Sequence, residues 1–330
     1  MSRFLFAVFC FLLCESYAIS AEVKERLRNT LKPFFVTVKA QPDYEVKNKA
    51  KVTLGRTLFF DKRLSKNSDI SCNSCHDLKN YGTNGEHYKK LREAGESFRD
   101  VPSIYNVNSL ELFAWDGGKK TLADQIKRSL ENEYEMGCDE KTLIERLKGI
   151  EGYKNLFSNA YPDKPEVTYK NIIDCLEVYI NGLVTPSPID RFIDGDDSQL
   201  TDEQIEGGKL FDSKNCYTCH TGSNFGGQMM QKMGVTKPWP NQKDQGYYHV
   251  TNNPGHKMIF RVSPLRNIEK TPPYFHDGSS RRIWDAIKKM AQYEMGIYVD
   301  ISDILKMQSF LKSFTGELPL EYIKEPSIPE

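Results

Sequence analysis

Residues 71–78 read SCNSCHDL, in which two residues separate a pair of cysteines and a histidine follows the second one directly. Residues 215–222, NCYTCHTG, repeat this arrangement. A zinc ion could take the four cysteines as ligands, but it would leave both adjacent histidines without a role, and so would a dithiol redox site. Covalent haem uses all six residues, since the cysteines form thioethers and the histidine ligates the iron. We therefore predict two c-type haems, one at Cys72, Cys75 and His76, the other at Cys216, Cys219 and His220.

The sequence before each motif is repeated as well. Residues 54–76, LGRTLFFDKRLSKNSDISCNSCH, and residues 207–220, GGKLFDSKNCYTCH, share a glycine, a basic residue, a Leu-Phe pair and an aspartate. Each stretch predicts a short helix that leads into a haem. The second helix is introduced by TDEQ, in which Thr201 and Gln204 match a capping box. We infer an all-α fold of two cytochrome c-like domains, each with one covalently bound c-type haem.

The join between the domains is predicted in residues 181–199, NGLVTPSPIDRFIDGDDSQ, where two prolines and a polar run interrupt helical periodicity. This gives a first domain over 21–185 and a second over 186–330. Residues 222–262 are rich in glycine, proline, asparagine and aromatics, and they predict a long loop with a short hairpin around the second haem. Apolar residues recur at helical spacing in residues 121–136, 141–157, 168–184, 283–295 and 300–314.

The first twenty residues, MSRFLFAVFCFLLCESYAIS, combine a basic residue, an apolar run and a small-residue end. They predict a secretory signal peptide over residues 1–20, cleaved after Ser20, and hence a soluble protein of the periplasm. The apolar run from Phe4 to Cys14 is too short to span the roughly 30 Å of a bilayer, so no stable membrane insertion is expected. The 45 basic and 45 acidic side chains give no reason to expect nucleic acid as a partner.

Two cysteines of the exported chain lie outside the haem motifs, Cys138 and Cys175. In an oxidising compartment they could form a disulfide. The helical pattern around Cys175 is equally typical of a buried free thiol. The sequence leaves both states open.

From Leu54 to about Pro319 the chain contains, in this order, the motifs LGRTLFFDKRLS, ISCNSCHDL, AWDG, EM, LVTPSPIDRF, GGKLF, CYTCH, VSPLRN and PYFHDGS. Their order and spacing resemble those of the bacterial di-haem cytochrome c peroxidases, a superfamily that includes the MauG-like enzymes. The resemblance implies reduction of hydrogen peroxide at the first haem, with electrons that a small soluble cytochrome c or a cupredoxin delivers to the second. It also implies a homodimer in many members.

The resemblance assigns roles to single residues. Met290 matches the sixth iron ligand of the second haem, a position at which MauG-like enzymes have a tyrosine. Trp115 matches a tryptophan that lies between the haems and couples them. Glu135 matches the acid/base residue over the first haem, which moves a proton between the two oxygens of peroxide. Gln125 matches a glutamine that orients the peroxide.

Further residues match the region between the two domains of the family. Arg266 is expected to pair with a haem propionate. The family's calcium ion has ligands that match Asp100, Thr271 and Pro273, the last two through backbone carbonyls, and waters must complete its shell. His276 is expected at the domain interface rather than on an iron, since Met290 already fills that site.

One departure from the family concerns the distal side of the first haem. Many di-haem peroxidases cap the resting iron with a histidine sixteen residues after the proximal one, and here that position is Arg92, which cannot ligate iron. His87 lies five residues earlier and reaches the iron only if this loop is built differently. We therefore expect a first haem that is ready for peroxide without prior reduction, or one with a cap that the pattern does not identify.

Two other functions fit the same motifs. A MauG-like oxidase would modify a partner protein, and a di-haem electron carrier would be inert to peroxide because both irons are six-coordinate. A methionine at one iron and a carboxylate near the other favour the peroxidase.

Overall fold

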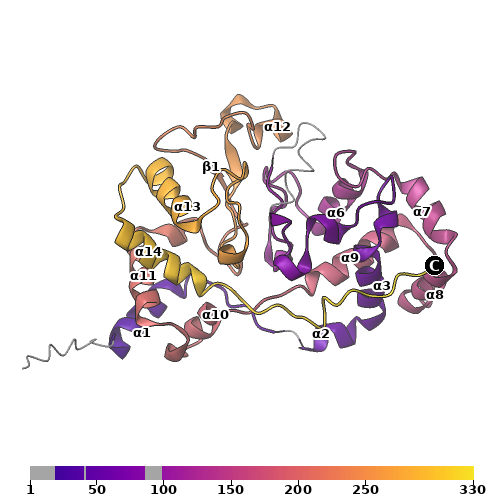
Figure 1. The fold of residues 1–330 in the computed structure, drawn as a ribbon, viewed down its shortest axis with the longest axis horizontal. Helices are drawn as coiled ribbons and strands as arrows, with labels where there is room; N and C mark the ends of the chain where they lie inside the picture. The colour runs from indigo at the N-terminus through magenta and orange to yellow at the C-terminus, as the bar shows by residue number, and fades with distance from the viewer. Residues whose placement is uncertain (1–18, 41, 86–98) are drawn as a thin grey trace, which may run out of the picture.

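The computed structural model describes residues 19–40, 42–85 and 99–330. These residues form two helical lobes side by side, with chain segments that cross between them along one edge (Figure 1). The predominantly helical fold agrees with the prediction, because the described residues contain one small two-stranded sheet. The helices of the first half are α1 (Ala21–Leu31), α2 (Pro42–Lys47), α3 (Lys49–Phe60), α4 (Cys72–Cys75), α6 (Leu122–Glu131), α7 (Glu140–Lys148), α8 (Glu151–Ala160) and α9 (Tyr169–Asn181). The second half contains α10 (Pro188–Ile193), α11 (Asp202–Ser213), β1 (Met230–Lys232), α12 (Tyr248–Thr251), β2 (Ile259–Arg261), α13 (Ile283–Met290), a π-helical turn (Ala291–Met295) and α14 (Ile301–Lys312).

Both lobes follow one plan. In the first, α3 packs across α9, and in the second α11 packs across α14. Each lobe has one haem-binding motif. In the first lobe it follows α3 and Asp61, and in the second it follows α11, whose last turn contains Asp212. The predicted capping box at the start of α11 is confirmed, since the Thr201 hydroxyl accepts a hydrogen bond from the backbone amide of Gln204 and the side-chain oxygen of Gln204 accepts one from the backbone amide of Thr201.

The glycine of the sequence repeat lies where the paired helices cross. A Cβ on Gly55 would stand 2.0 Å from the carbonyl oxygen of Cys175 in α9, and one on Gly207 would stand 1.9 Å from that of Lys306 in α14. A Cβ essentially never comes so close to an oxygen atom to which it is not bonded, so only glycine allows these two backbones to meet. The repeat is therefore a helix-packing signal as well as a lead into the haem.

Replacing Gly55 or Gly207 by alanine should destabilise the protein. At an open helix position alanine would stabilise by about 1 kcal/mol, but here the helices must separate, which typically costs about 1–3 kcal/mol or more. We expect a net loss of about 2 kcal/mol and a lower melting temperature for each variant, measured by calorimetry on the haem-loaded protein. Gly149→Ala is the control, because its Cβ would come no closer than 3.4 Å to another atom. Unchanged melting of the first two variants would contradict this packing.

The two ends of the chain pack into opposite lobes. Leu27 and Leu31 of α1, with Phe35, join the core of the second lobe, whereas Tyr322 and Ile323 near the C-terminus join the core of the first. Figure 1 shows α1 beneath α11 and the C-terminal segment reaching α8. The linear division into 21–185 and 186–330 therefore does not follow the two cores at either end of the chain. The predicted signal peptide, residues 1–20, lies outside the described residues except for its last two, of which Ser20 caps α1.

A second repeat positions the domain interface. An isolated bridge between Phe113 and Lys119 leads into α6, and a bridge with the same spacing, between Tyr274 and Ser280, leads into α13. The sequence of the first, FAWDGG, parallels that of the second, YFHDGS. Trp115 and His276 thus occupy equivalent places, and their rings meet edge to face with centroids 6.4 Å apart. The sequence analysis did not identify this repeat.

The long loop of the second lobe contains the predicted hairpin. Strands β1 and β2 pair antiparallel, with Gln231 opposite Phe260. In the described part of the chain no helix is both long and apolar enough to cross a membrane.

Candidate functional site

The first cysteine pair lies on α4. Ser71 caps this helix, and its backbone amide donates a hydrogen bond to the hydroxyl oxygen of Ser74. His76 follows as the last residue of the turn, and its Nδ1 lies 3.1 Å from the carbonyl oxygen of Gly82. Because a carbonyl only accepts, Nδ1 carries the proton and Nε2 remains as the nitrogen that can bind a metal. Burial lowers the pKa of His76, which keeps the ring neutral, as a ligand requires.

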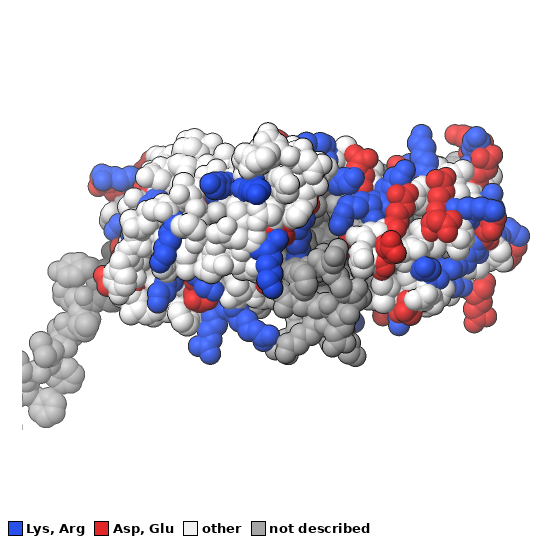
Figure 2. Space-filling model, turned by 90° about the horizontal axis from the view of Figure 1, so that it is seen from above, with Lys and Arg blue, Asp and Glu red and all other residues white. Residues whose placement is uncertain are grey.

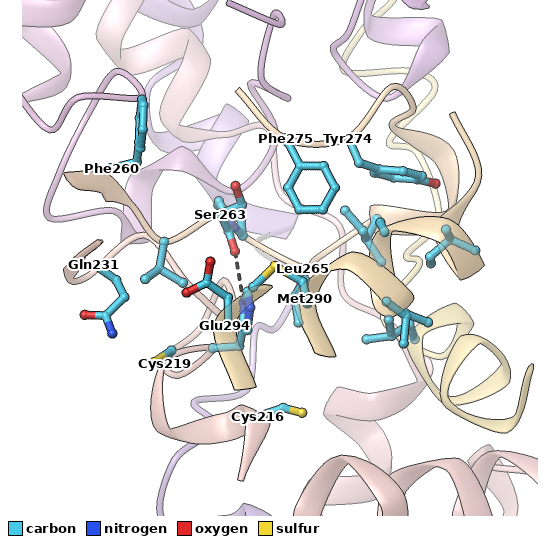
Figure 3. Close-up of a pocket in the computed structure, with 18 of the residues that line it drawn as sticks. Cys216, Cys219, Gln231, Phe260, Ser263, Leu265, Tyr274, Phe275, Met290 and Glu294 are labelled. Carbon is cyan, nitrogen blue, oxygen red and sulfur yellow. Dashed lines mark hydrogen bonds between the residues drawn. The ribbon is translucent and has the colours of Figure 1, made fainter. Parts of the chain in front are cut away.

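The second motif is built in the same way on a short turn, Cys216–Thr218. The Nδ1 of His220 lies 3.1 Å from the carbonyl oxygen of Ser263 and 3.3 Å from that of Phe225. A dashed line in Figure 3 marks the hydrogen bond at Ser263. Burial again lowers the pKa of the imidazole. Both histidines are therefore oriented by backbone carbonyls and present Nε2.

A cavity of about 450 Å³ opens beside the second motif. Cys216, Cys219 and His220 line it together with Met290, and Figure 3 shows Met290 and Glu294 on the same cavity wall. Met290 ends α13, and the chain continues as the π-helical turn. Such turns often occur at functional sites. A further methionine of this turn, Met295, also lines the cavity.

This cavity has the chemistry that a haem needs. Among the described residues, both ring nitrogens of His276 and the Nη1 of Arg261 are buried without a hydrogen-bond partner, and both residues line the cavity. Burial lowers the pKa of Arg261 to about 10. Unpaired buried donors are costly unless an acceptor meets them, and the carboxylates of haem propionates are such acceptors. The residues present therefore fit a haem, with sulfurs and an imidazole at its attachment side.

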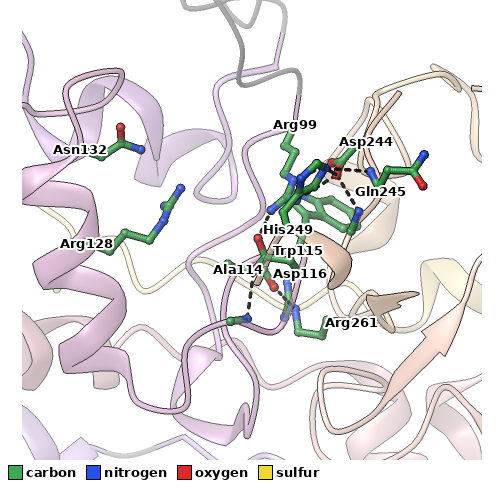
Figure 4. Close-up of polar contacts among 12 residues, drawn as sticks. Arg99, Ala114, Trp115, Asp116, Arg128, Asn132, Asp244, Gln245, His249 and Arg261 are labelled. Carbon is green, nitrogen blue, oxygen red and sulfur yellow. Dashed lines mark hydrogen bonds and ion pairs between the residues drawn. The ribbon is translucent and has the colours of Figure 1, made fainter. Parts of the chain in front are cut away.

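A network of charged side chains holds Trp115 between the lobes (Figure 4). Arg99 donates from Nε to Asp244 at 2.7 Å and from Nη2 at 3.0 Å, and it also contacts Asp116. Burial alone would raise the pKa of Asp244, but the hydrogen bonds and charge of Arg99 outweigh it and the pKa is lowered. The pair thus remains charged near neutral pH and joins the loop before Trp115 to the long loop of the second lobe.

Backbone contacts complete this arrangement. The indole of Trp115 donates to the carbonyl of Asp100 at 2.7 Å, and the amide of Asp100 donates to the carbonyl of His276. Arg261 donates from its amide to the carbonyl of Trp115 and from Nε to that of Ala114. Trp115 is therefore fixed against the wall of the cavity described above, which it also lines.

Glu135 lies in the first lobe, just beyond α6. Its Oε1 accepts from Arg128 at 2.7 Å and from Asn132 at 2.9 Å. Burial, and after it the charge of Glu135, raises the pKa of the Cys75 thiol to about 11, and the same charge acts on His76. The carboxylate thus lies near the first haem motif, and its side chain is 35% exposed rather than enclosed in an apolar surface.

Gln125 is placed one helical turn before Arg128. Its Nε2 donates to Ser129 at 3.2 Å, and its Oε1 is buried without a partner among the described residues. The structure thus brings Gln125 and Glu135 to the same end of the first lobe, apart from the cavity of the second motif.

Known proteins were compared with this chain. The family model described as di-haem cytochrome c peroxidase matches residues 49–198. The cytochrome c551 peroxidase of Nitrosomonas europaea is 34% identical over 81% of this chain and 80% of its own length. That of Pseudomonas aeruginosa is 34% identical over 84% and 82%. The chain belongs to the di-haem cytochrome c peroxidase family.

The family also includes relatives with another name. The methylamine utilization protein MauG of Methylophilus methylotrophus is 31% identical over 72% of this chain and 71% of its own length. Among solved structures, a MauG-like protein associated with microbial copper homeostasis superposes with a TM-score of 0.74 at 24% identity, over 88% of this chain and 97% of that one. That likeness concerns the fold. As a family member the chain is an enzyme of the di-haem peroxidase type, and the family binds two haems.

The remaining predicted residues of this peroxidase-family chain are placed as follows. Asp100, Thr271 and Pro273 line one cavity, but no group of three or more histidine, cysteine or acidic side chains suited to a metal exists among the described residues. Calcium therefore stays a prediction. Arg266 lies in the same cavity wall, yet its guanidinium is buried against Asp190, with contacts of 2.7 and 2.8 Å. Its pairing with a propionate also stays a prediction.

Four other residues were singled out in the sequence. Cys138 and Cys175 are both buried free thiols, so no disulfide joins them. His87 and Arg92 lie outside the described residues. Sequence patterns did not predict the roles of Arg261, Arg99 and Asp244, although the parallel between residues 113–118 and 274–279 could have pointed to the interface that they build.

Proposed function

We propose that this chain is a periplasmic peroxidase, exported by residues 1–20, that reduces hydrogen peroxide with electrons from a small soluble cytochrome c or a cupredoxin. Each turnover takes up one peroxide, two electrons and two protons and releases two waters. The haems, when bound, supply one iron that takes peroxide and another that relays electrons. The first would be held by Cys72, Cys75 and His76, the second by Cys216, Cys219, His220 and Met290.

The observation that carries this proposal is that two structurally equivalent positions, one in each lobe, hold different residues. Ser129 is the eighth residue of α6 and Met290 the eighth of α13, and the same bridged turn precedes both helices. A methionine thioether is a haem-iron ligand that raises reduction potential, whereas serine is not among the usual ligands. The first site is therefore suited to an open iron and the second to electron transfer, which are the two requirements of peroxide reduction.

Glu135 is the proposed proton carrier. Arg128 and Asn132 both donate to its Oε1, and among the described residues its Oε2 has no hydrogen-bond partner. Oε2 can thus accept a proton from the first peroxide oxygen and deliver it to the second, so that the departing oxygen leaves as water. Gln125 would orient the peroxide, and Trp115, fixed between the lobes, would couple the two sites. Asp100, Thr271 and Pro273 remain our proposal for a calcium site.

Turnover tests this proposal. The purified di-haem protein, given a reduced small cytochrome c or cupredoxin and peroxide, should oxidise two donors for each peroxide consumed. Measurement is by donor absorbance together with a peroxide electrode. Donor oxidation without peroxide consumption, or no reaction with any donor of this class, would contradict it.

A second candidate function follows from the relatives named MauG. In that case peroxide would drive the oxidation of a partner protein instead of a small donor. The methionine at position 290 opposes it, because MauG-like enzymes have tyrosine there. Mass spectrometry of candidate partners incubated with the protein and peroxide separates the two, since only the second candidate leaves a covalent change.

A further inference from the structure

A polar stripe runs along one side of α6. Its apolar face, Leu122, Ile126 and Leu130, packs into the core of the first lobe. The adjoining face has polar side chains at helical spacing, so they point the same way. These are Gln125, Arg128, Ser129 and Asn132.

Contacts tie this stripe to Glu135. Arg128 uses Nη1 to bind Glu135 Oε1, and among the described residues no other group pairs with its guanidinium. Among the described residues its Nε and Nη2 donors have no partner, and Figure 4 shows the labelled Arg128 extending away from its helix. The guanidinium is fixed at one edge and offers donors at the other.

The internal repeat places this stripe opposite the first haem motif. In the second lobe the equivalent helix, α13, presents Met290 to a cavity that also contains Cys216, Cys219 and His220. Ser129 is the counterpart of Met290 in α6. By the same geometry Ser129 and its neighbour Arg128 are placed toward the first motif.

An ordinary surface ion pair is the simplest alternative. Both side chains are 35% exposed, and an exposed pair contributes only about 0–1 kcal/mol to stability. Stability therefore gives little reason for this pair to exist. Two hydrogen bonds converging on one oxygen of Glu135, beside a buried and unpartnered Gln125 Oε1, are instead the features of an organised polar site.

We propose that Arg128 is an anion-binding residue of the first haem pocket, which holds Glu135 in place and donates hydrogen bonds to a small anion at the iron. The ligand class is small inorganic anions, of which hydroperoxide is the one relevant to turnover. When Glu135 takes the proton of peroxide, the remaining oxygen is negative, and a guanidinium beside it stabilises that charge. This inference rests on the proposed function, because it assumes an open iron at the first site.

Fluoride binding to the oxidised protein tests the inference without turnover. Absorbance titration gives the dissociation constant of fluoride at the first haem for the unaltered protein and for Arg128→Gln, Arg128→Lys and Lys127→Gln. Hydrogen bonds to charged groups contribute about 1.5–3 kcal/mol, so Arg128→Gln should weaken fluoride by roughly 10- to 100-fold. Arg128→Lys should recover part of this, since it keeps the charge. Lys127→Gln is the matched control, because Lys127 is 52% exposed and pairs with Glu131 instead.

Carbon monoxide binding to the reduced protein checks that the pocket survives. Carbon monoxide is neutral, so its affinity should be the same in Arg128→Gln and in the unaltered protein. If Arg128→Gln binds fluoride as tightly as the unaltered protein, or if Lys127→Gln weakens it equally, the inference is overturned while the proposed function stands. If the unaltered protein binds neither fluoride nor peroxide, both fail together.

Discussion

Glu135→Gln should lower the rate of peroxide reduction by about 10²–10⁴-fold, the usual contribution of a positioned acid/base group. Glutamine keeps the size of the side chain, and its oxygen can still accept from Arg128 and Asn132, which donate to Glu135 Oε1. It cannot take a proton from peroxide. The loss should therefore appear in the rate of reaction with peroxide, measured by stopped-flow absorbance, with little change in melting temperature.

A neighbouring acid supplies the control. Glu133 is exposed and two residues away, so Glu133→Gln removes the same charge without touching the contacts of Glu135. Native rates are expected for it. Equal rates in Glu135→Gln and Glu133→Gln would mean that the carboxylate at position 135 carries no proton in the reaction.

Met290→His should lower the reduction potential of the second haem by roughly 0.2 V, within the range of about 0.8 V that axial ligands span. Imidazole donates more strongly to oxidised iron than a thioether does, so it stabilises the oxidised state. The second haem would then have too low a reduction potential to accept electrons from the donor. Redox titration followed by absorbance measures the shift.

Met295 provides the matched control for this change. Both methionines line the cavity beside His220, Met290 at the end of α13 and Met295 at the end of the π-helical turn. Met295→Leu should leave the potential unchanged. If the potential of the second haem fell in Met295→Leu but not in Met290→His, the iron ligand would be Met295 and our account would be wrong.

The local chemistry of this chain was predictable from sequence, and its long-range contacts were not. Each haem motif is a run of five residues on a short turn, and the capping box of Thr201 and Gln204, which the structure confirms, spans four. The bond between Arg99 and Asp244 joins positions 145 residues apart. Nothing near either residue indicates the partner, because the contact depends on how the lobes assemble.

Two features of the structure could not be predicted from the sequence pattern. Helix α1 has a stripe of leucines that predicts burial but not the lobe in which it is buried, and it joins the second core rather than the first. Glu135 matches an acid/base residue over the first haem, but the sequence did not predict that Arg128 and Asn132 both donate hydrogen bonds to its carboxylate. A single sequence shows that Arg128 lies seven residues before Glu135, but only the turn after α6 brings them into contact.

The asymmetry of the two irons is the central claim, and an electron paramagnetic resonance spectrum of the fully oxidised di-haem protein tests it most directly. The first site, with Ser129 at the position equivalent to Met290, predicts one high-spin ferric signal that changes when peroxide or fluoride is added. The second site predicts one low-spin signal that does not change on addition of fluoride. Two low-spin signals, both unaffected by peroxide, would contradict the account and identify the protein as an electron carrier.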